Sequence, residues 1–237
     1  MAKKKKTRKQ LLKEPDEFLT FTQSLMRYVL EHRVQIAAGL GVLFAIVIVV
    51  SGVLYFSEKA ENRAFTMMNS AMERYNALSE EEGPEKAYQA VNEEFQTILE
   101  KYGDKDGGKL ARIAYGDIAF EAGAYDRAIE LYERALRDAD SYPSLKNFIL
   151  AGLAYSYEGN GDLASAVRYF EMITAGTTPL MKAEAFFNLG RIYAETGNPE
   201  KSAQAYETLI AEYPDATYID LVKERVAKTA AAESSPT

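Results

Sequence analysis

The chain has 237 residues, 47% of them hydrophobic, so it is long and apolar enough to bury a substantial core. It contains no cysteine and one histidine, His32, which excludes disulfide frameworks, thiolate metal sites, cysteine nucleophiles and histidine-based catalytic triads from the region that follows. The net charge of −7 is unevenly divided: residues 1–33 carry nine Lys/Arg and four Asp/Glu, whereas residues 34–237 carry 19 and 31. This division predicts two different environments for the two parts of the chain.

Residues 1–33 are predicted to form a basic, cytoplasmic N-terminus. The lysine-rich run at residues 3–9 resembles a nucleic-acid-binding or nuclear signal, but beside an apolar segment it better indicates membrane topology and an affinity for anionic lipid. Farther along, apolar residues recur at helical spacing, which suits a short helix lying in the membrane interface. They are Phe18, Phe21, Leu25, Val29 and Leu30.

Residues 34–57 contain no charged side chain, and residues 36–56 are apolar almost throughout. A helix over residues 36–56 rises roughly 31 Å, which matches a hydrocarbon layer of ~30 Å, so we predict a transmembrane helix. The alternative is a cleaved secretory signal. It fits less well because the apolar stretch exceeds the usual length of about 7–15 residues and no small-residue cleavage motif follows closely.

The flanking charges predict the orientation of this helix. Lys and Arg are retained on the cytoplasmic side, and they are concentrated before the apolar stretch. We therefore expect a single-pass protein of the bacterial inner membrane, with a cytoplasmic N-terminus and a periplasmic C-terminal domain. Within the helix, Ala37, Gly41 and Ala45 recur every four residues, a spacing that lets another helix pack closely.

Three later segments share an internal repeat, at residues 110–138, 148–176 and 184–212. In each, a glycine suited to a left-handed turn follows one predicted helix, and a small residue and then an aromatic follow on the next. The turn glycines are Gly123, Gly161 and Gly197; the small residues after them are Ala128, Ala166 and Ser202; the aromatics are Tyr132, Phe170 and Tyr206; the small residues before the turns are Gly116, Ala154 and Gly190. This pattern predicts tetratricopeptide-like helical hairpins.

The fold class is therefore predicted to be all-α: one N-terminal transmembrane helix followed by a solenoid of hairpins over residues 58–231. A degenerate unit is expected to come first, with its first helix at residues 60–78, continuous with the membrane helix or separated from it by a short break, and its turn at residues 80–84. Residues 215–231 are predicted to form a polar capping helix, as solenoid ends require, and residues 232–237 a disordered tail.

The layout resembles the YfgM-like family, ancillary subunits of the Sec translocon with a short cytoplasmic N-terminus, one span and a periplasmic tetratricopeptide-like domain. The resemblance extends from about Phe18 to Arg225 and rests on architecture. The third repeat, NLGRIYAETGNPEKSAQAYETLIAEYPDATY, is also similar to periplasmic repeat proteins of the outer-membrane assembly and cell-division coordinator type. The family resemblance implies translocon components, periplasmic chaperones or unfolded clients as partners.

The sequence favours binding over catalysis. Asp104 and Asp106 begin a pattern like a calcium loop, but Gly107 comes too early and Tyr115 stands where a bidentate glutamate is needed. We therefore predict no enzyme activity, no metal site, no cofactor and no nucleic-acid partner. If the first helices of the hairpins line a concave face, nine residues are predicted to form a partner-binding groove. They are Ile113, Asp117, Phe120, Phe148, Tyr155, Glu158, Phe187, Arg191 and Glu195.

Two functions fit these features. The first is a translocon-associated adaptor or chaperone for proteins that emerge into the periplasm. The second is a structural scaffold of an envelope assembly or cell-division complex.

Overall fold

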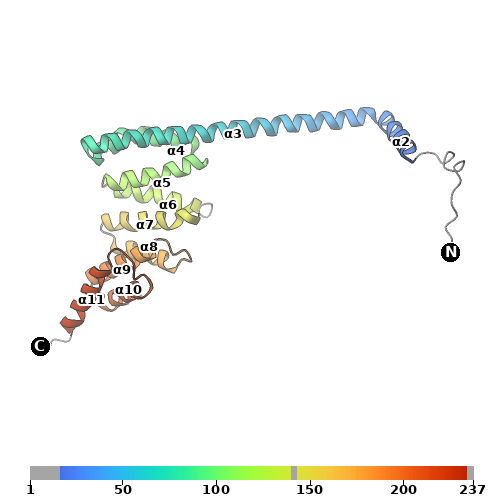
Figure 1. The fold of residues 1–237 in the computed structure, drawn as a ribbon. Helices are drawn as coiled ribbons and strands as arrows, with labels where there is room; N and C mark the ends of the chain where they lie inside the picture. Colours follow the sequence, from blue (N-terminus) through green and yellow to red (C-terminus); the bar gives the residue numbers. More distant parts are fainter. Residues whose placement is uncertain (1–16, 140–142, 234–237) are drawn as a thin grey trace, which may run out of the picture. The chain divides into compact units, whose positions relative to one another are not determined.

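The computed structural model describes residues 17–139 and 143–233, and in these residues the regular structure is helical, with no strand (Figure 1). The predicted all-α class is therefore confirmed. The chain divides into two units, Met1–Glu58 and Lys59–Thr237.

The first unit contains helix α2, Glu17–Glu31, and the beginning of helix α3, Arg33–Glu82. From Leu40 to Phe56 the large apolar side chains of α3 are 50–68% exposed. Among the described residues, α3 is the one helix that is long and apolar enough to cross a membrane, judged by length and composition. It begins one residue before the predicted span.

The second unit begins within α3. Ala64, Ala71 and Tyr75 of this helix are buried, and Arg74 pairs with Glu94 of helix α4, Pro84–Tyr102. The predicted degenerate hairpin therefore exists, formed by the end of α3 and by α4. The residues between Arg33 and Glu82 are helical without a break, so the first helix of this hairpin is continuous with the apolar segment.

The predicted turn of the degenerate hairpin, residues 80–84, was too long. The structure is helical through Glu82 and again from Pro84, which leaves Gly83 alone as the non-helical residue. Its φ of 88° is favourable only for glycine, and proline suits the first position of the next helix because its missing N–H is not needed there.

Three helical hairpins follow in chain order, as Figure 1 shows. They are α5 (Asp106–Glu121) with α6 (Tyr125–Asp138), α7 (Pro143–Gly159) with α8 (Leu163–Ala175), and α9 (Lys182–Glu195) with α10 (Pro199–Glu212). The three predicted turn glycines, Gly123, Gly161 and Gly197, have φ of 74°, 82° and 75°. The repeat pattern thus identified the left-handed turn of each hairpin correctly.

Large aromatics fill the space left by small residues between these helices. The ring of Tyr132 from α6 lies against Gly116 of α5 and Gly152 of α7: a Cβ added at Gly152 would approach the ring to 2.5 Å, and one at Gly116 to 2.9 Å. Tyr206 of α10 occupies the equivalent place beside Gly190. The aromatic therefore packs both within its hairpin and against the next hairpin.

Helix α11, Ile219–Glu233, closes the second unit. It begins four residues later than the predicted capping helix and extends two residues beyond its predicted end; residues 234–237 lie outside the described residues. Val222 of α11 is completely buried, in a cluster with Tyr206 and Leu209 of α10. The helix thus covers the apolar end of the last hairpin.

Candidate functional site

The predicted groove residues lie on α5, α7 and α9, the first helices of the three hairpins, which we call the A helices. Side chains of α5 contact α7, and side chains of α7 contact α9, so these helices form one continuous surface. We refer to it as the A-helix face.

On α5, the three predicted residues have different environments. Ile113 is half-buried and packs against the core. Asp117 is exposed as a residue, and its carboxylate accepts a hydrogen bond of 2.5 Å from the Tyr132 hydroxyl. Desolvation by neighbouring atoms raises the pKa of Asp117, an effect that the Tyr132 hydrogen bond opposes. Phe120 is half-buried, with its ring 6.4 Å from that of Tyr155.

On α7, Phe148 is the predicted residue most open to a partner, with 47% of its surface exposed. Tyr155, in contrast, connects two repeats: its hydroxyl donates to the Glu184 carboxylate of α9 and accepts from the Asn188 side-chain amide at 2.8 Å. Burial and the hydrogen bond to Glu184 raise the pKa of Tyr155. A neutral tyrosine is therefore held in place between the second and third hairpins.

An ion pair joins the same two hairpins farther along the face. The Arg191 guanidinium of α9 lies 2.7 Å from the Glu158 carboxylate of α7 and 3.0 Å from the Asn188 side-chain oxygen. The hydrogen bond with Glu158 raises the pKa of Arg191. Both charged side chains are about three-quarters covered, being 28% and 25% exposed, whereas Glu195 is exposed.

The third-hairpin end of the predicted groove is occupied by the chain itself. The Phe187 ring lies 4.5 Å from the Tyr218 ring, which immediately precedes α11, and 6.4 Å from the Tyr206 ring. The Arg225 guanidinium of α11 donates to the Tyr206 hydroxyl at 3.4 Å. Phe187 is therefore part of the packing of the C-terminal segment rather than an open groove position.

The structure thus brings the predicted residues of α7 and α9 together and leaves Asp117, Phe148 and Glu195 as the exposed ones. Glu184 and Asn188, which hold Tyr155, are not among the predicted residues. Their signal was present: they precede Arg191 by seven and three residues and so lie on the same side of α9.

The small residues predicted for helix packing, Ala37, Gly41 and Ala45, are exposed on α3, and a Cβ added at Gly41 would meet nothing within 4 Å. Gly41 therefore contacts no second helix in this structure. Their role stays a prediction.

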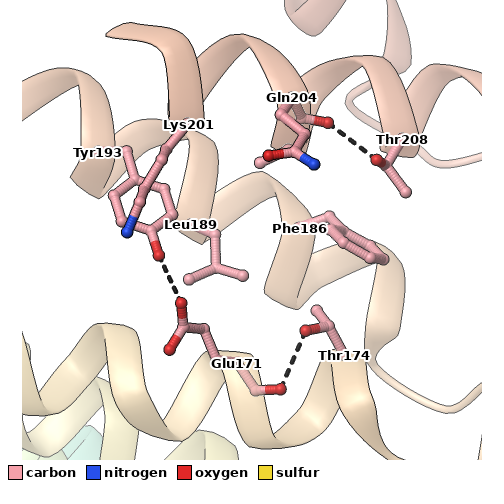
Figure 2. Close-up of a pocket in the computed structure, with 9 residues that line it drawn as sticks. Glu171, Thr174, Phe186, Leu189, Tyr193, Lys201, Gln204 and Thr208 are labelled. Carbon is pink, nitrogen blue, oxygen red and sulfur yellow. Dashed lines mark hydrogen bonds between the residues drawn. The ribbon is translucent and has the colours of Figure 1, made fainter. Parts of the chain in front are cut away.

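A hollow lies between α8, α9 and α10, lined by residues outside the predicted groove (Figure 2). The Tyr193 hydroxyl donates to the Glu171 carboxylate at 2.6 Å, and the Lys201 ammonium lies 5.1 Å from the centre of the Tyr193 ring. Thr208 donates to the backbone oxygen of Gln204, as Figure 2 shows. The Tyr193–Glu171 hydrogen bond joins α9 to α8 and so links neighbouring hairpins, whereas the other two contacts lie within the α9–α10 hairpin.

Across residues 17–139 and 143–233, no group of three or more histidine or acidic side chains is arranged to hold a metal ion. The chemistry of the A-helix face is that of aromatic rings, carboxylates and one paired guanidinium. These groups suit recognition of another polypeptide.

Comparison with known protein families agrees with the geometry. The family model described as tetratricopeptide repeat matches residues 92–143 and 152–217, which include α5, α6, α8, α9 and α10 and the second half of α7. A search of curated proteins gives no match. The helical hairpins of this chain are therefore tetratricopeptide repeats, units that mediate protein–protein interaction.

Proposed function

We propose that this chain is a single-span protein of the bacterial inner membrane whose periplasmic tetratricopeptide array binds other proteins without catalysing a reaction. The span would be the charge-free part of α3, with the N-terminus in the cytoplasm. The array would serve as an adaptor or chaperone beside the Sec translocon, for proteins emerging into the periplasm.

One observation carries this proposal: the apolar side chains of α3 up to Phe56 are exposed, while Ala64, Ala71 and Tyr75 of the same helix are buried in the repeat unit. A run of exposed apolar residues this long is unfavourable in water and favourable in a bilayer. The adjoining repeats supply the protein-binding part. The family resemblance supports the translocon as the partner.

Protease protection tests the topology. In intact spheroplasts, added protease should digest the repeat array and leave an N-terminal fragment protected by the membrane. An array that stays intact until the membrane is lysed would contradict the periplasmic location. The digestion is repeated after lysis as a control. An array that is still intact after lysis resists the protease because of its fold, and not because the membrane protects it.

Site-specific crosslinking tests the partner. A photoreactive residue at Phe148 should crosslink to translocon channel subunits or to nascent periplasmic proteins, because this side chain is exposed on the A-helix face. Asp117 is also exposed, but replacing it removes the acceptor of the Tyr132 hydrogen bond. Met172 of α8 is the matched control, since it is an exposed apolar residue outside that face. Tyr155 and Arg191 are poorer positions because replacing them breaks contacts between hairpins.

The identity of the crosslinked proteins separates the two candidate functions. Capture of cell-division or outer-membrane assembly factors at Phe148, without translocon subunits, would favour the scaffold, to which the third repeat points by its similarity to envelope repeat proteins. Equal crosslinking at Phe148 and Met172 would contradict the A-helix face as the binding surface.

A further inference from the structure

Helix α2 has an unpartnered apolar face. Its large apolar side chains Phe21, Leu25, Met26, Val29 and Leu30 are 42–66% exposed. Successive residues of a helix are about 100° apart, which places these side chains on one broad side of α2. The polar residues Gln23, Ser24, Arg27 and Glu31 fall on the other side.

The position of α2 in the chain indicates which kind of surface covers its apolar face. Only His32 separates α2 from α3, and the charge-free stretch begins immediately after Arg33. If α3 crosses a bilayer, the end of α2 is therefore held at the edge of the hydrocarbon layer. A helix of 15 residues is about 22 Å long and can lie along that edge, where its apolar side chains leave water and its polar side chains do not.

The charge of the preceding segment fits the same surface. Residues 1–16 contain seven Lys/Arg and two Asp/Glu. Basic residues beside a span are attracted to anionic headgroups of the cytoplasmic leaflet. The same charge also sets the predicted orientation of the span, so it is the position of α2 at the end of the span that favours a lipid surface over a protein partner.

We propose that α2 lies in the headgroup region of the membrane, with its apolar face toward the acyl chains, and that the basic N-terminal segment binds anionic lipid there. This proposal rests on the span proposed for α3. It makes the N-terminal region a second, lipid-binding surface, separate from the protein-binding array.

The absence of tryptophan from the chain permits a direct test, because one introduced tryptophan is a unique fluorophore. The full-length protein is reconstituted in lipid nanodiscs as Phe21→Trp, with Ser24→Trp as the control on the polar side of α2 and Val47→Trp as the reporter of the span. Lipids brominated near the headgroup end of the acyl chain quench a nearby indole. Circular dichroism checks that each variant keeps the helix content of the parent.

We expect strong quenching at Phe21→Trp, weak quenching at Ser24→Trp, and quenching at Val47→Trp by lipids brominated deep in the chain. Equal, weak quenching at Phe21→Trp and Ser24→Trp, with Val47→Trp quenched, would overturn the α2 proposal and leave the span intact. An unquenched Val47→Trp would instead overturn the span, and the α2 proposal with it.

The lipid charge is tested with the same reporter. Quenching at Phe21→Trp should be stronger in discs that contain phosphatidylglycerol than in discs of phosphatidylcholine alone. Replacing Lys3, Lys4, Lys5 and Lys6 with glutamine should remove most of that difference. Quenching that is the same in both lipids would show that anionic lipid is not the ligand.

Discussion

Tyr132 and Tyr206 show how single residues set the spacing of the hairpins. Tyr132 lies against Gly116 and Gly152 on two neighbouring helices and Tyr206 against Gly190, positions where any side chain would enter the volume of the ring. Glycine in a helix costs about 0.5–1 kcal/mol relative to alanine, and here the packed aromatic ring offsets that cost.

Alanine substitution at these glycines should therefore destabilise the array despite improving helix propensity. We expect Gly152→Ala to lower the free energy of unfolding by about 1–3 kcal/mol and Gly116→Ala by less, because the added Cβ approaches Tyr132 more closely at Gly152. Urea unfolding followed by circular dichroism measures both. In a Tyr132→Leu background the two penalties should shrink; penalties that persist there would place the cause elsewhere.

Three tyrosines with raised pKa values, of which Tyr75 and Tyr157 donate hydrogen bonds to carboxylates, predict sensitivity to alkaline pH. Burial, as the first cause, raises the pKa of Tyr75, Tyr157 and Tyr218 from 10.0 to about 12. Their protons are thus held more tightly in the folded state than in the unfolded state, so their stabilisation is complete below pH 10 and is lost as pH rises through about 12. Stability should be level up to about pH 10 and then fall.

Phenolate absorbance during a pH titration checks this expectation, because ionisation of these tyrosines should coincide with the loss of helix. Tyr75→Phe provides the control: it removes the 2.6 Å hydrogen bond to Glu121 together with one titrating group. Its alkaline decline should be shallower than that of the parent. A steep early decline in both proteins would contradict the assignment.

At the scale of elements, polar contacts between A helices fasten one hairpin to the next. Tyr155 bonds to Glu184, and Glu158 pairs with Arg191, so the second and third hairpins share two links on the predicted binding face. These links favour a fixed arrangement of α7 and α9, which presents exposed residues such as Phe148 at constant spacing.

A double-mutant cycle on Glu158→Gln and Arg191→Gln measures the ion pair. We expect a coupling of about 1 kcal/mol, the upper end for exposed pairs, because both side chains are about three-quarters covered. The Arg74–Glu94 pair is the matched control: its side chains are 51% and 38% exposed, so its coupling should be smaller. A larger coupling at Arg74–Glu94 would contradict the argument from burial.

At the scale of the repeat unit, helix α11 covers the apolar side of the third hairpin. Helix α11 buries Val222 against Tyr206 and Leu209 and places Tyr218 on Phe187. The last unit of a solenoid needs such a cover, since its apolar side would otherwise meet water.

Ending the chain after Asp215 should therefore expose this surface. We expect a lower unfolding midpoint, together with increased binding of a hydrophobic dye to the truncated protein. Leu221→Ser in α11 is the control, because that side chain is 43% exposed and its replacement should have little effect. Unchanged stability on truncation would show that α11 does not cap the array.

The sequence by itself determined the repeat architecture: glycine at left-handed turns, small residues opposite aromatics and a charge-free stretch are local requirements that residue types reveal directly. It placed the turn glycines correctly, but it left open whether the first repeat helix continues the membrane helix, which the structure shows it does. The predicted first turn was too long, because glutamate favours helix and Glu80–Glu82 extend α3 up to Gly83.

Only the tertiary structure decided which residues of the A-helix face are accessible. Four predicted residues are of types expected in a binding groove, yet they contact other parts of the chain. Tyr155 and Glu158 of α7 contact α9, where Arg191 is the partner of Glu158, and Phe187 contacts the segment before α11. Helical periodicity gives the direction of a side chain from its own helix. It does not give the neighbouring helix that covers it, which depends on contacts between residues about 30 positions apart.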